Sequence, residues 1–320
     1  MNNLNLNMHY IIGIDGGGTK TDCIITDLGG NILYQCSGSA SNIMIQGMEK
    51  VSETVFGLIE NCKNHLNISY SDIKIILLGT SGAGRKNDSA KLENTFAEYS
   101  HKRSVKFNYF KVESDATIAL EGAFSSKPGS ILIAGTGSIL FCKDIEGRVH
   151  RVGGFGKHLG DEGGGYSIGK KGLNVISKEF DGRSDVSVIL KLAAKKFGIN
   201  SPEKLIEEVY INKMEIASFA PIVIEAAEKG DSNALKILEE ESEELVSHII
   251  AMVKKAGKPA LNVALIGGLI NHDNVYSRIL RKKMILEIPD IKIKVPDYSP
   301  AFGAVLMAKK ILSSKNYESS

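Results

Sequence analysis

A glycine-rich turn between two apolar runs occurs twice in this chain, and this repeat constrains the fold more than any other feature of the sequence. The first copy occupies residues 11–27 and the second occupies residues 131–144. Short β-branched runs on both sides of a tight turn are typical of β-hairpins. Glycines lack a Cβ, so the N–H groups of such a turn can converge on one anion, and a threonine hydroxyl adds a donor. The repeat therefore predicts two hairpins that hold one polyphosphate from two sides.

The first turn comes within one residue of a P-loop but does not match it. Gly13 and Gly18 have the required spacing, whereas Thr19 stands where a P-loop has lysine. A P-loop also opens a helix, and residues 22–27 instead continue as a β-branched strand. The glycine fingerprint of dinucleotide-binding domains is excluded for the same reason. We therefore expect hairpin turns to hold the phosphates.

The elements predicted after each hairpin follow a single order, βββαβαβα. In the first half, the apolar pattern predicts a third strand at 32–36, a helix over 51–62, a strand at 73–78, a helix at 89–99, a strand at 107–112 and a helix at 115–124. The order returns in the second half once a long helical stretch is set aside. These patterns indicate an α/β protein made of two similar domains.

The repeat also predicts where the domains divide and where a ligand binds. We expect a first domain at 1–124 and a second at 125–320, with the helical insertion at about 169–258. The helix from about residue 301 is a candidate for packing back on the first domain. In such a pair the ligand site is expected in the cleft between the halves, at the carboxyl ends of the strands.

Composition and cysteine spacing exclude several classes of protein. The formal charge of +2 comes without a concentrated basic patch, so neither nucleic acid nor a membrane surface is an expected partner. No apolar run approaches the ~18 residues of a membrane span, and no signal peptide precedes the first strand, so a cytoplasmic protein is expected. The cysteines have no CxxC spacing, and neither a zinc site nor a disulfide framework is predicted; they are Cys23, Cys36, Cys62 and Cys142.

Two aspartates at expected strand ends are candidates for catalysis. Asp15 fits either a turn-initiating residue or a carboxylate that holds a hydrated Mg²⁺ beside the phosphates. Asp115 fits either a helix N-cap or a general base that accepts the proton of a hydroxyl as it attacks the γ-phosphoryl group of ATP. The residues alone leave both alternatives open.

A glycine-rich loop at 153–169 is the candidate sugar contact. It contains eight glycines and the acid pair Asp161 and Glu162. Carboxylates accept paired hydrogen bonds from vicinal hydroxyls, and glycines let the backbone approach a flat sugar face. Glycoside hydrolysis needs two opposed carboxylates, which adjacent residues do not establish. A second acidic run, at 239–244 in the insertion, is expected to be a solvated helix face.

Taken together, these segments resemble the N-acetylglucosamine kinase group of the BadF/BadG/BcrA/BcrD ATPase family, within the sugar kinase, Hsp70 and actin superfamily. The motifs occur in family order over nearly the whole chain. They are DGGGTKT at 15–21, SN at 41–42, GTSGAGR at 79–85, SDA at 114–116, AGTGS at 134–138, GDEGGGYSIG at 160–169, IGG at 266–268 and PAFGA at 300–304.

The resemblance implies two RNase H-like domains that close over ATP, Mg²⁺ and an amino sugar. The implied reaction is phosphorylation of the 6-hydroxyl of N-acetylglucosamine, with N-acetylmuramic acid and glucosamine as alternatives. A homodimer is also expected. The implied roles are phosphate binding by Gly16, Gly17, Gly18, Thr19, Lys20, Gly135, Thr136 and Gly137; Mg²⁺ at Asp15; adenosine at Gly267 and Gly268; proton transfer by Asp115; and sugar binding by Asn42, Ser81, Asp115, Thr136, Gly137, Ser138 and Asp161, with Ile139 near an N-acetyl group.

Two departures from the family pattern bear on the identity of the sugar. Phe155 stands where the family usually has tryptophan, and Gly164 stands where it usually has serine. Both flank the proposed sugar contacts, and neither supplies a group that phosphoryl transfer needs. A second class with the same family pattern, the ATPase activators of acyl-CoA dehydratases, carries cluster-binding cysteines that are absent from both glycine-rich turns here.

Overall fold

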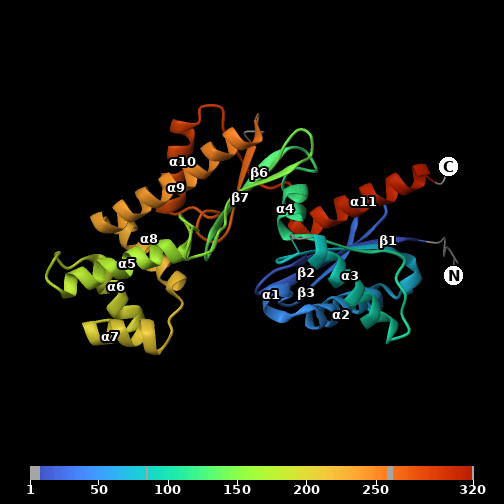
Figure 1. Cartoon of the computed structure of the whole chain (residues 1–320), viewed down its shortest axis with the longest axis horizontal. Coiled ribbons are helices and arrows are strands. Elements are labelled where there is room, and N and C mark those ends of the chain that lie inside the picture. The colour runs from blue at the N-terminus through green and yellow to red at the C-terminus, as the bar shows by residue number, and fades with distance from the viewer. Residues whose placement is uncertain (1–7, 84–85, 258–261, 319–320) are drawn as a thin grey trace. The chain divides into compact units, whose positions relative to one another are not determined.

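The computed structural model describes residues 8–83, 86–257 and 262–318, which form two compact units (Figure 1). One unit contains the described residues up to Lys127 together with those from Pro296 onward, and the other contains the described residues within Pro128–Val295. Gly84 and Arg85 of the matched 79–85 segment, and Lys258 at the expected end of the insertion, lie outside the described residues. Among the described residues, no helix combines the length and the apolar character that crossing a membrane requires.

The first unit is built on a five-stranded mixed sheet with the order β3-β2-β1-β4-β5. The first three strands form an antiparallel meander that begins with the predicted hairpin, and the last two run parallel to β1. The strands are β1 (Tyr10–Gly16), β2 (Lys20–Asp27), β3 (Ile32–Ser39), β4 (Ile73–Thr80) and β5 (Phe110–Ser114).

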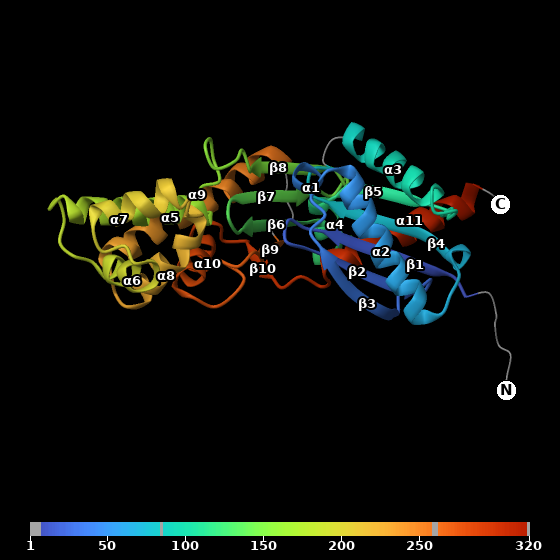
Figure 2. The same cartoon turned by 90° about the horizontal axis from the view of Figure 1, so that it is seen from below.

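Helices cover both faces of this sheet, which explains why β1 and β4 are continuous apolar runs (Figure 2). Ile12 and Ile14 of β1 pack with residues of α2 and α3 on one face. Ile11 packs with residues of α4 and α11 on the other. The helices are α1 (Ile43–Gln46), α2 (Met48–Leu66), α3 (Lys86–His101), α4 (Asp115–Ala123) and α11 (Pro300–Glu318).

The second unit repeats the sheet, with the order β10-β9-β6-β7-β8. Its strands are β6 (Gly129–Ala134), β7 (Ser138–Lys143), β8 (Val149–Gly153), β9 (Asn262–Ile266) and β10 (Lys292–Lys294). A large apolar core joins this sheet to the helical insertion. The helical elements are α5 (Gly165–Phe180), α6 (Val188–Phe197), α7 (Pro202–Ile206), the π-helical turn η2 (Glu207–Ile211), the 3-10 turn η3 (Ile216–Phe219), α8 (Ala220–Glu228), α9 (Ser232–Ala256) and α10 (Val275–Glu287).

The matching strand orders confirm the predicted fold class, an α/β protein with two RNase H-like βββαβαβα units and a helical insertion in the second. One predicted strand was misplaced, because residues 107–112 were expected to be extended and β5 instead covers Phe110–Ser114. Phe107 belongs to a loop, where its ring lies 5.6 Å from that of Phe96 and 5.5 Å from that of Tyr70. A partly buried aromatic residue in a loop gives the same apolar signal as a strand residue.

Gly13 sets how closely α11 approaches β1. A Cβ added there would lie 2.3 Å from the Ala301 carbonyl oxygen and 2.7 Å from Val305 Cγ2. Gly13→Ala is therefore expected to lower the free energy of unfolding by about 1–3 kcal/mol, the usual cost of overpacking. Urea denaturation followed by circular dichroism measures the change.

Gly57→Ala is the matched control. Gly57 lies within α2, is exposed, and has open space where a Cβ would be added. This variant is expected to be more stable than the native chain by about 0.5–1 kcal/mol, because alanine is the better helix former. Equal effects at the two glycines would contradict the close packing of α11 on β1.

Candidate active site

Three parallel strands of the first unit end at one edge of its sheet, and predicted site residues follow these ends. Thr80 of β4 lies opposite Gly16 of β1 on one side and the last residue of β5 on the other. Asp15 is one residue from the end of β1, Ser81 follows β4, and Asp115 follows β5. The carboxyl ends of parallel strands are the usual place for ligand-binding side chains in α/β proteins. The fold therefore brings Asp15, Ser81 and Asp115 to one edge.

Asp115 is not the cap of its helix, which resolves one of the two alternatives considered for it. Ser114 caps α4, and its hydroxyl accepts a hydrogen bond from the Thr117 N–H at 3.1 Å. The Asp115 carboxylate instead accepts one hydrogen bond from the Ala116 N–H at 2.8 Å and one from the Ser81 hydroxyl. These donors fix a half-buried carboxylate that still has lone pairs for a further donor.

Asp15 carries the most perturbed carboxyl group of this edge. It is a strand residue, paired with Asp22 across the hairpin, and does not initiate a turn. Burial, together with the negative charges of Asp115 and Asp22, raises the pKa of Asp15 from 3.8 to about 6, although Lys20 opposes the shift. A carboxylate surrounded mainly by carboxylates is a favourable site for a cation.

The turn between β1 and β2 is closed by one backbone bond, from the Gly17 N–H to the Lys20 carbonyl at 3.0 Å. Gly18, Thr19 and Lys20 at its tip are exposed, with open space next to Gly18. The Lys20 ammonium lies 2.8 Å from an Asp22 carboxylate oxygen. The turn thus presents backbone donors, a hydroxyl and a cation whose present partner is a neighbouring surface carboxylate.

Buried hydroxyl groups hold this turn against the neighbouring loops, and residue spacing within one segment does not reveal these contacts. The Ser41 hydroxyl accepts a hydrogen bond from the Thr21 hydroxyl at 2.8 Å. The Ser41 carbonyl accepts one from the Thr80 hydroxyl at 2.7 Å. The Ser41 N–H donates to the Gly17 carbonyl at 3.1 Å. A Cβ on Gly16 would lie 2.4 Å from the Ser41 hydroxyl. All three hydroxyl residues are fully buried, so they position the turn and do not contact a ligand.

Asn42 follows Ser41 and is the N-cap of α1. Its side-chain oxygen accepts the Met44 N–H at 2.9 Å, so the amide nitrogen is the group with which it can donate to a ligand. The next residue is tied to the adjacent loop, because the Ile43 N–H donates to the Ser81 carbonyl at 3.2 Å. Asn42 and Ser81 therefore belong to one connected edge with Asp115.

In the second unit, the predicted turn is joined to the first turn of α5. Within it, the Gly135 N–H donates to the Gly137 carbonyl at 2.9 Å. The carbonyls of Gly135 and Thr136 accept the N–H groups of Gly165 and Tyr166 at 2.8 and 2.9 Å. Thr136 itself is exposed at the tip. The turn at 134–138 and the end of the glycine-rich loop at 153–169 are therefore joined by hydrogen bonds.

Asp161 lies directly against this turn. A Cβ on Gly137 would be 2.2 Å from an Asp161 carboxylate oxygen, and the other oxygen accepts the Gly156 N–H at 3.1 Å. Asp161 has a φ of +63°, which strains the loop locally. A Cβ on Gly164 would lie 2.6 Å from the Gly137 carbonyl carbon, so the serine usual in the family does not fit this backbone.

Ser138 and Glu162 take structural positions in the same loop. Ser138 is buried and its hydroxyl donates to the Glu162 carbonyl, so this hydroxyl holds the loop. The Glu162 carboxylate lies 4.0 Å from His248 Nε2, whereas Asp161 faces Gly137. The two adjacent acids thus point to different partners and do not form the opposed pair that glycoside hydrolysis requires.

The Gly267 and Gly268 turn lies beside the second hairpin turn. Gly267 follows β9, has a φ of +108°, and would place an added Cβ 2.1 Å from the Ala134 carbonyl oxygen. Ala134 immediately precedes Gly135. Gly268 has open space where a side chain would be. Each unit therefore assembles its own share of the predicted site residues at the carboxyl edge of its sheet.

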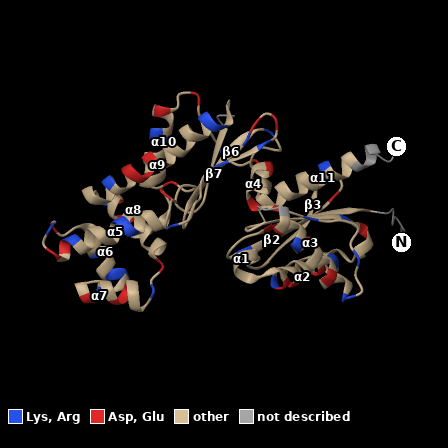
Figure 3. Ribbon diagram, viewed as in Figure 1, with Lys and Arg blue, Asp and Glu red and all other residues tan. Residues whose placement is uncertain are grey.

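The acidic run on α9 was expected to be a solvated face, and that expectation is wrong for Glu241. Acidic and basic residues are distributed along this helix (Figure 3), and Glu239, Glu243 and Glu244 are exposed. Glu241 is only 1% exposed. It lies three residues after Leu238 and four before Leu245, on the apolar side of the helix. The spacing from Leu238 and Leu245 indicates a buried position for Glu241. The neighbouring acidic residues suggested an exposed face instead.

Glu241 holds the glycine-rich loop to the insertion. Its carboxylate accepts hydrogen bonds from the Gly163 N–H, from the Ser167 hydroxyl at 2.7 Å, and from Lys171, whose ammonium lies 2.9 Å away. The Tyr276 hydroxyl donates to the Gly163 carbonyl at 2.8 Å. One buried acid therefore fixes the loop that contains Asp161 by contacts from α5 and α9.

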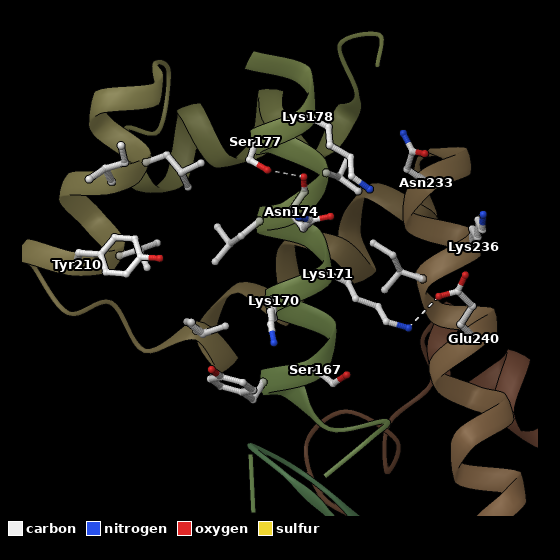
Figure 4. Close-up of a pocket in the computed structure, with 18 residues that line it drawn as sticks. Ser167, Lys170, Lys171, Asn174, Ser177, Lys178, Tyr210, Asn233, Lys236 and Glu240 are labelled. Carbon is white, nitrogen blue, oxygen red and sulfur yellow. Dashed lines mark hydrogen bonds and ion pairs between the residues drawn. The ribbon is translucent and has the colours of Figure 1, made fainter. Parts of the chain in front are cut away.

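A cavity of about 960 Å³ lies between α5, α7, η2 and α9 (Figure 4). Figure 4 shows Lys171 of α5 directed toward Glu240 of α9, an ion pair of 2.8 Å. The lining also includes Lys170, Lys178 and Lys236. Among the described lining residues, none is a site residue predicted from the sequence. This cavity is therefore separate from the candidate site, although Ser167 and Lys171 border both the cavity and the Glu241 contacts.

Removing the Glu241 carboxylate tests its role in positioning the loop. Glu241→Ala is expected to lower the free energy of unfolding by about 2–3 kcal/mol, because Lys171 and the Gly163 N–H lose a buried partner. Amide exchange at Gly163 should become faster in this variant. Glu240→Ala is the control, since Glu240 pairs with the same lysine at the surface and should cost no more than ~1 kcal/mol. Equal losses in both variants would contradict the assignment.

The raised pKa of Asp15 predicts a stability change with a definite sign. A carboxyl group whose pKa is higher in the folded state than in the unfolded state stabilises the fold when protonated, and this contribution is lost as pH rises from about 4 through about 6. Without divalent cations, Asp15→Asn should therefore be more stable than the native chain by about 1–2 kcal/mol at pH 7.5. The difference should vanish near pH 4.

Asp27→Asn provides a control of opposite sign. The pKa of Asp27 is lowered mainly by hydrogen bonds that its carboxylate accepts from Asn31. This variant should be less stable than the native chain at pH 7.5. Thermal unfolding over pH 4–8 measures both variants, and a pH-independent difference for Asp15→Asn would show that burial does not strain its charged form.

Comparisons with known proteins agree with this architecture. The model of the BadF/BadG/BcrA/BcrD ATPase family matches residues 12–308. An N-acetylmuramic acid/N-acetylglucosamine kinase of Clostridium acetobutylicum is 35% identical over 307 residues, which cover 94% of this chain and 99% of that relative. An N-acetyl-D-glucosamine kinase of Dictyostelium discoideum is 29% identical over 95% of this chain and 98% of its own length.

A solved structure from Chromobacterium violaceum, proposed to be an N-acetylglucosamine kinase, superposes with a TM-score of 0.73 at 25% identity. The match covers 95% of this chain and 99% of the other. The family model alone spans most of the chain, including both glycine-rich turns and the strands that precede Asp115 and Gly267. The chain belongs to the BadF/BadG/BcrA/BcrD ATPase family.

Proposed function

We propose that this protein is an ATP-dependent kinase that transfers the γ-phosphoryl group to the 6-hydroxyl of N-acetylglucosamine, with N-acetylmuramic acid as a second substrate. The relatives that cover almost the whole chain are kinases of these sugars, which supports the substrate class. The observation that carries the proposal is the position of the Asp115 carboxylate directly after a parallel strand, where the Ser81 hydroxyl orients it. Ser114 caps α4, so the Asp115 carboxylate is not needed as the helix cap.

Asp115 would act as the general base. One carboxylate oxygen takes the proton of the sugar hydroxyl while that hydroxyl oxygen bonds to the γ-phosphorus and the bond to the ADP oxygen breaks. The hydrogen bonds from Ser81 and the Ala116 N–H hold the carboxylate in a fixed orientation, so little reorganisation is needed at the moment of transfer.

The two glycine-rich turns would bind the phosphates. In the first turn, backbone N–H groups would come from Gly16, Gly17 and Gly18, and Thr19 would add its hydroxyl. The Lys20 ammonium would leave its ion pair with Asp22 and bind a phosphate oxygen. In the second, Gly135, Thr136 and Gly137 offer the same kinds of donor. Turns of this kind form concave anion sites because successive N–H groups point inward. The Gly267 and Gly268 turn, with no side chain to obstruct it, would border the adenosine.

Asp15 fits the magnesium ion that such a reaction uses. Its carboxylate is an oxygen donor of the type that Mg²⁺ prefers, and the carboxylates around it leave its own charge poorly compensated. Bound Mg²⁺ would neutralise charge that develops on the phosphate oxygens. The residue's part is to hold the ion near the first turn.

The sugar would contact residues from both glycine-rich regions. Asn42 offers its amide nitrogen, Ser81 its hydroxyl, and Asp161 a carboxylate suited to paired sugar hydroxyls. Ser138 would act through the loop it holds, and Ile139, whose side chain packs on Gly154, would border an N-acetyl group. The homodimer and the cytoplasmic location stay predictions.

A substrate panel tests the proposed reaction. Purified protein with ATP and Mg²⁺ should release ADP in the presence of N-acetylglucosamine and, more slowly, N-acetylmuramic acid. Faster ADP release with glucosamine would show that the preferred substrate is not N-acetylated, and the protein would still be an amino sugar kinase. If no amino sugar raises ADP release above the sugar-free rate, the proposal is wrong.

Asp115→Asn separates chemistry from binding. The variant should keep its affinity for ATP and lose at least ~100-fold in kcat, the usual contribution of a general base. Ser114→Ala is the control, because loss of the helix cap should cost ~1 kcal/mol of stability with little change in kcat. Near-native turnover by Asp115→Asn would remove this residue from the mechanism.

A further inference from the structure

Three cysteines that are far apart in the sequence converge inside the first unit. Cys23 of β2 lies opposite Cys36 of β3, and α2 places Cys62 over the same face of the sheet. The Sγ atoms of Cys23 and Cys62 are 3.7 Å apart, and those of Cys36 and Cys62 are 3.8 Å apart. All three sulfur atoms lie within 4.8 Å of one another. Sequence spacing alone predicted no metal-binding group among the cysteines, because it does not report this convergence.

The surroundings of the cluster distinguish it from ordinary filling of the core. Cys23 and Cys62 are fully buried, and Cys36 is partly exposed at the edge of the cluster. Single buried cysteines commonly act as small apolar side chains, and Cys142 of the second unit is one such residue. Apolar filling does not require three thiols from three elements to point at one another. Among the described residues, this is the one group of three or more potential metal ligands at such spacing.

The sulfur spacing matches that of a metal site. A tetrahedral zinc ion with bonds of ~2.3 Å holds its sulfur ligands ~3.8 Å apart. Soft thiolate ligands favour zinc and copper(I) over magnesium or calcium. A fourth ligand is not required from the protein, because a water molecule can complete a site with three protein ligands. The partly exposed side chain of Cys36 marks where solvent reaches the cluster.

We propose that Cys23, Cys36 and Cys62 bind one thiophilic metal ion, with Zn²⁺ as the natural occupant. Binding releases the three thiol protons to solvent as three sulfur–metal bonds form. The ion would fasten β2, β3 and α2 together. β2 begins in the candidate phosphate turn and β3 ends two residues before Ser41, so the ion would stabilise the scaffold of the first glycine-rich turn. This site is independent of the proposed kinase reaction.

Metal titration of reduced, metal-free protein tests the proposal. Zn²⁺ should bind with a stoichiometry of one per chain in competition with a coloured chelator, and Co²⁺ should give a thiolate-to-cobalt charge-transfer absorption. Cys36→Ser should weaken binding at least ~10-fold, since loss of a direct ligand exceeds the usual effect of an outer-shell change. Cys142→Ala is the matched control and should bind like the native chain.

Two further measurements cover the case in which a variant fails to fold. In the native protein, Zn²⁺ should protect the partly exposed Cys36 thiol from a thiol reagent and raise the unfolding temperature. The Zn²⁺-dependent rise should be absent from Cys36→Ser and present in Cys142→Ala. Absence of Zn²⁺ binding by native reduced protein would overturn the proposal. Unchanged affinity in Cys36→Ser, or a disulfide in the cluster with no metal binding by the reduced form, would overturn it as well.

Discussion

Close packing at glycine residues holds together the candidate site residues of each unit. Gly16 packs on the Ser41 hydroxyl, Gly137 on the Asp161 carboxylate, and Gly267 on the Ala134 carbonyl, all closer than an added Cβ would permit. These contacts let loops from different strands meet at the carboxyl edge of each sheet. Hydrogen bonds to backbone groups then fix the loops, so exposed donors such as Thr19 and Thr136 extend from rigid turns.

The arrangement places carboxylates where they destabilise the folded chain. Burial, together with the nearby charges of Asp115 and Asp22, raises the pKa of Asp15, and Lys20 opposes the shift. Such electrostatic strain is characteristic of functional sites, because a group that binds a cation or accepts a proton cannot also be fully neutralised by the protein. The buried acid Glu241 differs in this respect, because its carboxylate has three partners and holds the glycine-rich loop at 153–169.

The element order could be predicted because hydrophobic periodicity is a local signal. The strand expected at 73–78 begins where β4 does, and both hairpins form around the predicted turns. Features that depend on tertiary packing were missed. The Phe107 ring fills an aromatic cluster from a loop, Glu241 is an acid on an apolar face, and the three clustered cysteines meet only after β2, β3 and α2 have packed. Residue spacing within one element does not report contacts between elements.

The identity of the phosphorylated atom tests the central claim most directly. Incubation of the protein with ATP, Mg²⁺ and N-acetylglucosamine, followed by phosphorus–proton correlation spectroscopy of the products, assigns the phosphate to one sugar carbon. A base at Asp115 that accepts the proton of the 6-hydroxyl predicts a single phosphomonoester coupled to the two protons at carbon 6. A phosphate at another carbon, or release of inorganic phosphate with the sugar unchanged, would contradict the account.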